Sequence, residues 1–308
     1  MFSFNLVSFF ERLFFKPNLL DWVIIFLLAP LSFFYATLML FRRLFTPKKH
    51  YGIPIVSIGN LTIGGSGKTP FVIAVAKRYR DVFVVSRGYG RESRGLVEVS
   101  RRGEILTDVK SSGDEPMLMA KSLKSSASVI VSENRHIAIE RAIEQGAKVV
   151  FLDDGFNRVD IKKYEILLFP KTIKNYMPLP AGPFREFFFI KRFANLSLYE
   201  EKDFKRVVKV KNATNKMLLA TAISNPHRLK PFLPKGVVAE YYLEDHAFFN
   251  ESELKEKMSE VGATSLLVTQ KDEVKMQEFK LPLSVMELEL EIQNEILEKI
   301  DRYIENEK

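Results

Sequence analysis

The fold of this 308-residue chain is decided by the stretch Gly59-Asn60-Leu61-Thr62-Ile63-Gly64-Gly65-Ser66-Gly67-Lys68-Thr69-Pro70. A β-branched apolar run at 53–58 precedes it, and an apolar helical pattern at 71–79 follows it. Glycines let successive backbone N–H groups curl around phosphate oxygens, and the amino terminus of a helix adds partial positive charge. The stretch therefore predicts a phosphate-binding loop between a strand and a helix.

In a loop of this kind, a P-loop, a lysine reaches the β- and γ-phosphates and the hydroxyl after it ligates Mg²⁺. Lys68 and Thr69 occupy these two places. Thr62 stands where the usual G-x-x-x-x-G-K-[ST] pattern has its first glycine, which is a departure from the pattern. The residues predicted to bind the nucleotide are Gly64, Gly65, Ser66, Gly67, Lys68 and Thr69.

A second apolar run, 149–152, ends in two acidic residues, Asp153 and Asp154. P-loop enzymes place a carboxylate at the end of a neighbouring strand, where it completes the magnesium shell. We therefore predict Thr69, Asp153 and Asp154 as metal-binding residues, with Asp153 at the strand end and Asp154 available to orient water or contact substrate. The alternative is that the two aspartates cap a turn.

Further short apolar runs alternate with amphipathic stretches; they lie at 82–86, 128–131 and 165–169. Such alternation predicts an α/β fold with a P-loop NTPase-like parallel sheet and flanking helices. Another set of runs after about residue 207 predicts a second, smaller α/β domain. The expected division is into membrane-anchoring helices at 1–45, a P-loop domain at 46–206 and the smaller α/β domain at 207–308.

The amino terminus predicts contact with a membrane. Twenty consecutive residues, 22–41, carry no charge, and as a helix they would extend about 30 Å, one hydrocarbon core. The segment before them repeats apolar residues at helical spacing, which is typical of an interfacial helix. Basic residues after the run favour a cytoplasmic location for the rest of the chain. A transmembrane span, a helix in the membrane plane and a core helix of a soluble protein all stay open.

Composition excludes some functions and favours others. The chain has no cysteine, so it has no disulfide, thiolate nucleophile or Cys-ligated metal. A formal net charge of +8 favours anionic partners, and without a recognition motif for nucleic acid we expect lipid or a phosphorylated substrate instead. Four arginines in loops after predicted strands are candidate phosphate ligands or solvated side chains: Arg87, Arg91, Arg94 and Arg135.

Taken in order, the motifs resemble those of a known family, the lipid A 4'-kinases (tetraacyldisaccharide 4'-kinases) of Gram-negative bacteria. The resemblance includes the apolar amino terminus and the glycine loop. It continues through Ser86-Arg87-Gly88-Tyr89-Gly90, Gly113-Asp114-Glu115-Pro116, Asp153-Asp154-Gly155-Phe156, Leu179-Pro180-Ala181-Gly182-Pro183-Phe184-Arg185-Glu186, Ala222-Ile223-Ser224-Asn225-Pro226, Asp245-His246 and Thr269-Gln270-Lys271-Asp272. The order and spacing of these motifs carry the resemblance, which covers nearly the whole chain.

The resemblance implies transfer of the γ-phosphoryl group of ATP, with Mg²⁺, to the 4'-hydroxyl of a tetraacylated glucosamine disaccharide 1-phosphate, forming lipid IVA. It implies anchoring by the amino-terminal segment at the cytoplasmic face of the inner membrane, with this glycolipid and the membrane surface as partners. We expect no nucleic acid and no obligate protein partner. The alternatives are a membrane-associated regulatory P-loop ATPase and a noncatalytic membrane scaffold.

The resemblance also implies the catalytic residues. Asp114, assisted by His246, would accept the proton of the sugar hydroxyl, and Lys68, Arg185 and Glu186 would lie near the reacting phosphates. From the residues alone, an aspartate in this setting also caps a helix, a lone histidine is also structural, and an Arg-Glu pair is also a surface ion pair. Departures from the family pattern are Asn157-Arg158 in place of Gln-His, Ala247 in place of a second histidine and Gln270 in place of a common glutamate.

Overall fold

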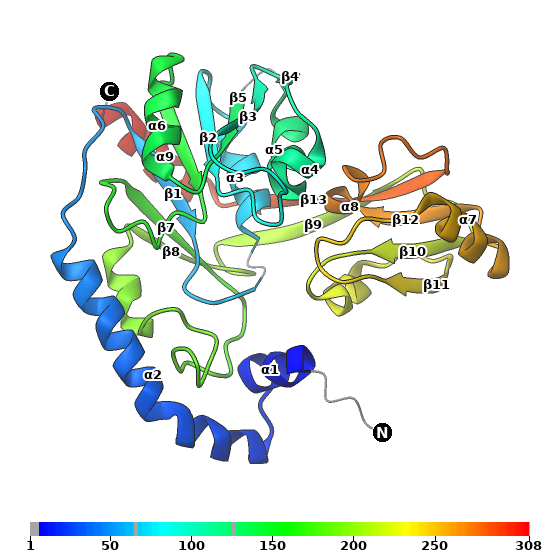
Figure 1. The fold of residues 1–308 in the computed structure, drawn as a ribbon, viewed down its shortest axis with the longest axis horizontal. Helices are drawn as coiled ribbons and strands as arrows, with labels where there is room; N and C mark the ends of the chain where they lie inside the picture. The colour runs from blue at the N-terminus through cyan, green and yellow to red at the C-terminus, as the bar shows by residue number, and fades with distance from the viewer. Residues whose placement is uncertain (1–5, 65–66, 125–126, 308) are drawn as a thin grey trace. The chain divides into compact units, whose positions relative to one another are not determined.

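The computed structural model describes residues 6–64, 67–124 and 127–307 (Figure 1). The chain forms two compact units, each assembled from separated stretches of sequence. Unit 1 takes the described residues of 1–68, 152–204 and 292–308, and unit 2 takes those of 69–151 and 205–291. The predicted division at residues 45 and 206 stays a prediction.

Unit 1 contains parallel strands, and the first two of them largely coincide with apolar runs of the sequence. β1 (Ile55–Gly59) pairs with β7 (Tyr164–Phe169), and β7 pairs with β8 (Leu196–Tyr199), both in parallel. Every residue of β1 is buried, so the strand that leads to the glycine loop is a rigid core element. The remaining elements of this unit are α1 (Leu6–Phe15), α2 (Leu19–Phe45), the 3₁₀ helix η2 (Phe188–Phe193) and α9 (Asn294–Asn306).

The first part of unit 2 contains further short strands with helices between them. β2 (Val82–Ser86) and β5 (Ala127–Val131) are parallel, whereas β3 (Val97–Arg101) runs antiparallel to β5 and to the short β4 (Glu104–Ile105). Sequence reasoning missed this antiparallel edge. The flanking helices are α3 (Lys68–Ala76), α4 (Val109–Ser112), α5 (Asp114–Leu123) and α6 (Arg135–Glu144), and β6 (Val149–Asp153) carries the chain from unit 2 into unit 1.

The second part of unit 2, residues 205–291, contains another α/β arrangement; the smaller α/β domain predicted at 207–308 stays a prediction in its bounds. The five strands of this arrangement lie in the order β11-β10-β12-β13-β9, and the three inner pairings between β11 and β13 are parallel. The bounds are β9 (Phe204–Lys211), β10 (Met217–Thr221), η3 (Pro226–Phe232), β11 (Val237–Tyr242), α7 (Glu251–Glu260), β12 (Ser265–Thr269), α8 (Gln270–Glu273) and β13 (Leu283–Ile292).

The long blue helix of Figure 1, α2, is apolar along most of its 27 residues. By length and composition it is able to cross a membrane. One narrow stripe of this helix is buried, namely Asp21, Ile25, Ser32, Ala36 and Arg43. Many of its other side chains are large, apolar and exposed, for example Phe26 at 78% and Leu27 at 71%.

The buried stripe fastens α2 to unit 1 at both ends and in the middle. Asp21 accepts two hydrogen bonds of 3.0 Å from Arg12 of α1. Ser32 Oγ accepts from the backbone N–H of Ala181 at 2.8 Å. Arg43 donates to both carboxylate oxygens of Glu186, at 2.8 and 2.6 Å. The apolar helix is therefore an integral part of unit 1.

We expect Arg43→Met to lower the free energy of unfolding by about 3–5 kcal/mol, because it leaves the carboxylate of Glu186 buried without its countercharge. The matched control is Arg42→Met, which removes an exposed guanidinium that donates to the carbonyl of Asn157. That control should cost less than about 1.5 kcal/mol. Denaturant unfolding in detergent measures both variants, and equal losses would contradict the assignment.

Candidate active site

The glycine loop begins where β1 ends and finishes at α3, in the predicted strand, loop and helix order. Gly64 and Gly67 have φ values of +91° and +84°, a left-handed conformation that glycine adopts without steric cost. Two of the residues predicted to bind phosphate, Gly65 and Ser66, lie outside the described residues. Phosphate binding by this loop stays a prediction from the sequence.

The side chain of Lys68 lies between the loop and an acidic residue. Its Nζ donates to Asn60 Oδ1 at 3.2 Å and is 3.8 Å from Asp154 Oδ1. Asn60 is fully buried, and its amide donates to the carbonyl of Gly64 at 3.3 Å, so the group that holds the lysine is itself fixed. Sequence reasoning gave Asn60 no role, although an asparagine at the start of the glycine loop, directly after a predicted strand, was a usable signal.

The two aspartates after β6 differ in exposure and in contacts. Asp153 is 3% exposed at the strand end. Asp154 adopts a φ of +53°, which is uncommon outside glycine, and its N–H donates to the carbonyl of Ile58 at 2.9 Å. Its carboxylate accepts from Arg185 at 3.2 and 3.3 Å. Lys68, Asp154 and Arg185 are thus brought together in unit 1.

Arg185 and Glu186 were predicted as a charged pair near the phosphates, and the structure gives them different partners. Arg185 contacts Asp154, next to Lys68. Glu186 is 4% exposed and pairs with Arg43 of α2. Its carboxylate oxygens are bound by that guanidinium, so a direct contact of Glu186 with phosphate stays only a prediction from the family resemblance.

Unit 2 brings Asp114 and His246 together although 132 positions separate them. His246 Nδ1 lies 3.0 Å from both carboxylate oxygens of Asp114. Because an ionised carboxylate only accepts hydrogen bonds, Nδ1 carries the shared proton and Nε2 of a neutral ring is the acceptor. The Asp114 side chain is 3% exposed and that of His246 is 18% exposed, so the imidazole is the more accessible of the two groups.

The backbone around this pair is unusual. His246 has a φ of +65°, and such a conformation in a non-glycine residue costs about 1–3 kcal/mol and clusters at functional sites. Gly90 makes room for the ring, because a Cβ at that position would lie 3.2 Å from His246 Cγ. The ring of Tyr89 is 5.2 Å from the imidazole. The Gly-Tyr-Gly motif therefore acts locally by shaping the space around His246.

Positive charge surrounds the carboxylate of Asp114. Burial by itself would raise the pKa of Asp114, but the hydrogen bond from His246 and the ammonium groups of Lys271 and Lys275, 3.6 and 4.0 Å away, outweigh it and lower the pKa. Burial by itself would lower the pKa of Lys271, but the neighbouring carboxylates of Glu115, Asp114 and Asp245 outweigh this effect and raise the pKa. Asp114 is thereby held as a carboxylate.

Of the four loop arginines considered as phosphate ligands, two are engaged within unit 2. Arg91 donates to Glu133 and to the carbonyl of Gly95, both at 2.6 Å. Arg135 is 4% exposed and donates to the carbonyl of Ser132. Arg87 and Arg94 are exposed, so these two keep the reach that a phosphate ligand needs.

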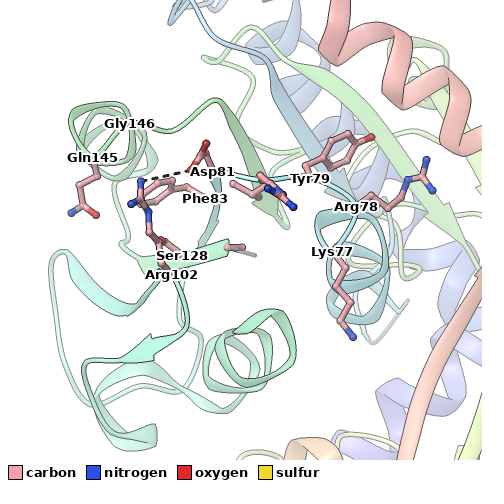
Figure 2. Close-up of a pocket in the computed structure, with 12 residues that line it drawn as sticks. Lys77, Arg78, Tyr79, Asp81, Phe83, Arg102, Ser128, Gln145 and Gly146 are labelled. Carbon is pink, nitrogen blue, oxygen red and sulfur yellow. Dashed lines mark hydrogen bonds and ion pairs between the residues drawn. The ribbon is translucent and has the colours of Figure 1, made fainter. Parts of the chain in front are cut away.

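A cavity of about 420 Å³ lies elsewhere in unit 2 (Figure 2). It opens at the amino ends of β2 and β5, and its lining includes Lys77, Asp81, Phe83, Arg102 and Ser128. Figure 2 shows Asp81 facing Arg102, at 3.7 Å. Ligands of open α/β sheets bind at the carboxyl ends of the strands, so this cavity is separate from the predicted site.

The sequence of this chain is similar to those of known proteins. The model of the LpxK family, tetraacyldisaccharide-1-P 4'-kinase, matches residues 24–207 and 190–305. The tetraacyldisaccharide 4'-kinase of Helicobacter acinonychis is 50% identical over 96% of this chain and 95% of that protein. That of Aliarcobacter butzleri is 44% identical over 93% of each. The chain belongs to the tetraacyldisaccharide-1-P 4'-kinase family.

The structural comparison places the chain in the same family. The crystal structure of LpxK from Aquifex aeolicus in complex with ATP is 27% identical, with a TM-score of 0.76 over 91% of this chain and 99% of that one. The resemblance drawn from the motifs is confirmed, as is the P-loop type of α/β fold. These matches favour the family of lipid kinases over the rival interpretations as a regulatory ATPase or a scaffold.

Oxygen-bearing side chains that the sequence predicts as cation ligands are among the described residues of this member of the tetraacyldisaccharide-1-P 4'-kinase family. Thr69 follows Lys68 in the first turn of α3 and is 8% exposed, and Asp153 ends β6. No group of three or more His, Cys, Asp or Glu side chains suited to a metal is found among the residues that the structure describes. Mg²⁺ is usually held by one or two carboxylates together with substrate phosphates and water, and this donor set fits that pattern.

We expect Asp114→Asn to destabilise the protein in a pH-dependent way. Because the pKa of Asp114 is lowered in the folded state, its stabilising contribution is complete above the unfolded pKa of about 4 and is lost as the pH falls through the folded value. The difference in unfolding free energy between wild type and variant should therefore shrink from about pH 5 to pH 3. Urea unfolding across that range measures it, and a constant difference would argue against an ionised Asp114.

Proposed function

We propose that this chain transfers the γ-phosphoryl group of ATP to the 4'-hydroxyl of tetraacyldisaccharide 1-phosphate, forming lipid IVA. The observation that carries the proposal is the meeting of Lys68, Asp154 and Arg185 beside a glycine loop, in a chain of this kinase family. The relative from Aquifex aeolicus, solved with ATP, supports ATP as the donor. The reaction leaves ADP and releases one proton from the sugar hydroxyl.

On the donor side, backbone N–H groups of the loop, including Gly64 and Gly67, would bind the phosphates. The amine of Lys68 would exchange its contacts with Asn60 and Asp154 for the β- and γ-phosphates. Arg185 would neutralise charge on the phosphoryl group as it moves, which is a common role of arginine in this chemistry. We assign Glu186 the role of holding α2 through Arg43.

Thr69 and Asp153 are the residues that we propose to hold Mg²⁺, and Asp154 follows Asp153 in sequence with its carboxylate partly exposed. When bound, the ion supplies charge neutralisation at the β- and γ-phosphate oxygens. The buried position of Asp153 fixes its carboxylate direction, and Asp154 is turned toward Lys68 and Arg185 by its left-handed backbone.

On the acceptor side, the Asp114–His246 pair would accept the proton of the 4'-hydroxyl. A sugar hydroxyl is a weak nucleophile, so a positioned base contributes to the rate. Both Asp114 oxygens already face His246 Nδ1, and the imidazole is the more exposed group, which supports entry of the proton through His246 Nε2. The two side chains then share the proton as one coupled base.

The amino terminus would hold the enzyme at the membrane that contains its lipid substrate, at the cytoplasmic face of the bacterial inner membrane. The contacts of α2 support a helix in the membrane plane. A spanning helix would carry its docked partners, such as the Ala181 backbone and the Arg43–Glu186 pair, into hydrocarbon, where polar groups are costly. With one stripe on the protein, the exposed apolar side of α2 is free to enter lipid.

Phosphoryl transfer from radiolabelled ATP to tetraacyldisaccharide 1-phosphate in detergent with Mg²⁺ tests the proposed activity. Lys68→Ala should lower kcat by at least about a hundredfold, because it removes the ammonium group that neutralises charge on the transferred phosphoryl group. The matched control, Lys77→Ala, changes an exposed lysine just after the same helix and should leave the rate near that of the wild type. ATP hydrolysis that needs no acceptor and yields no lipid product would favour the regulatory ATPase instead.

Flotation with anionic phospholipid vesicles tests the membrane assignment. The double variant Phe26→Glu/Phe34→Glu should bind vesicles at least tenfold more weakly. Each change removes about 2 kcal/mol of favourable free energy of transfer into lipid and adds a negative charge. Val238→Glu, at another exposed apolar site, should bind like the wild type. Unchanged flotation of the double variant would show that α2 does not enter the lipid.

A further inference from the structure

The Asp114–His246 pair belongs to a closed ring of four side chains in unit 2. Asp114 Oδ2 is 3.0 Å from His246 Nδ1, and His246 Nε2 is 3.5 Å from Asp245 Oδ2. Asp245 Oδ1 is 3.2 Å from Lys271 Nζ, which is 3.6 Å from Asp114 Oδ2. Carboxylates and nitrogen groups alternate around the ring, so each member faces two members of the other kind.

We propose that Lys271 and Asp245 are positioning residues that set the net charge of this ring, and so its affinity for the proton that the acceptor hydroxyl releases. This inference rests on the proposed function. With a neutral imidazole, two carboxylates and one ammonium group leave one negative charge on the ring. Uptake of one proton brings the ring to neutrality, and low-dielectric surroundings favour that state.

The proton balance of the reaction requires such an acceptor. The 4'-oxygen forms a bond to the γ-phosphorus while the bond from that phosphorus to the β–γ bridging oxygen breaks, and the bridging electrons leave with ADP. The hydroxyl proton passes to His246 Nε2, the nitrogen that faces Asp245. Asp245 then faces an imidazolium, and its other oxygen stays with Lys271.

A buried salt bridge behind the ring supports the histidine loop. Asp272 is fully buried, accepts from Thr221 Oγ1 at 2.6 Å and lies 3.1 Å from Lys275 Nζ. Lys275 in turn donates to the carbonyl of Ala247, next to His246, at 3.0 Å. The charge of Lys275 is therefore largely compensated by Asp272. Lys271, which is 17% exposed and whose contacts are with ring members and Glu115, is the cation that governs the ring.

Lys271 and Asp245 carry opposite charges, so removing the charge of each should shift the titration of the four-residue ring in opposite directions. Loss of the ammonium group in Lys271→Met favours the protonated ring and moves its titration to higher pH. Loss of the carboxylate charge in Asp245→Asn favours the unprotonated ring and moves its titration to lower pH. Among the described residues, Tyr89, Glu115 and Lys275 contact ring members, and Asp272 contacts Lys275. These four groups are the same in both variants.

The experiment follows the ring titration by ¹³C NMR of histidine-labelled full-length protein in detergent, with and without the substitutions. The chain has four histidines, so His246→Gln identifies the signal. We expect the midpoint of His246 to rise by about one pH unit in Lys271→Met and to fall by about one in Asp245→Asn. Lys271→Arg should restore it. Lys209→Met removes an exposed lysine paired with Glu289 and should not move it.

The acid limb of kcat against pH, measured in parallel, should move in the same directions, with the KM for ATP changed less than twofold. Titration midpoints that are unchanged in both variants, or that shift in the same direction in both, would overturn the proposal. A merely structural role of Lys271 and Asp245 predicts no opposite shifts. NMR shifts of the expected signs in a protein without acceptor-dependent transfer would instead count against the proposed function and leave the charge assignment standing.

Discussion

The close approach of Gly59 and Phe156 is the constraint on which the arrangement of unit 1 depends. A Cβ on Gly59 would lie 2.6 Å from Phe156 Cβ, so only glycine lets the turn after β6 rest on the start of the phosphate loop. That contact sets the place of Asp154 relative to Lys68. The ring of Phe156 also contacts Arg43 of α2, whose guanidinium carbon lies 4.0 Å from the ring centroid. The apolar helix and the phosphate loop thus meet on one aromatic residue.

Several buried charges among the described residues lie beside a countercharge. Arg43 pairs with Glu186, Lys275 with Asp272, and Asp114 with His246 and Lys271. Burying an ion costs several kcal/mol, and the attraction of a partner returns that cost only when the geometry is good. Such pairs add little net stability, but losing one member is expensive, and so they fix positions. In unit 2 these pairs hold the loop that contains His246. Without them, the strained backbone of His246 would relax.

The sequence predicted the parts of the site that rest on local chemistry. The strand, glycine loop and helix around Lys68 follow from residue order alone, as does the acidic end of β6. The meeting of Asp114 and His246 does not, because their contact spans two stretches of chain and no local pattern encodes it; there the resemblance to a family supplied the expectation. The partners of Glu186 and Lys271 were missed for the same reason. An ion pair between residues more than a hundred positions apart, such as Arg43 and Glu186, produces no local pattern in the sequence from which it could be predicted.

The attachment of α2 has a consequence for anyone who wishes to handle this protein without detergent. Deleting the apolar amino terminus is a common route to a soluble fragment, and it treats such a helix as a removable tail. Here a fragment starting after residue 45 would lack the guanidinium that covers Phe156 and neutralises Glu186. The polypeptide left behind would have an open, charged socket beside its phosphate loop. A soluble form is better sought by making the lipid-facing side of α2 polar while its buried stripe is kept.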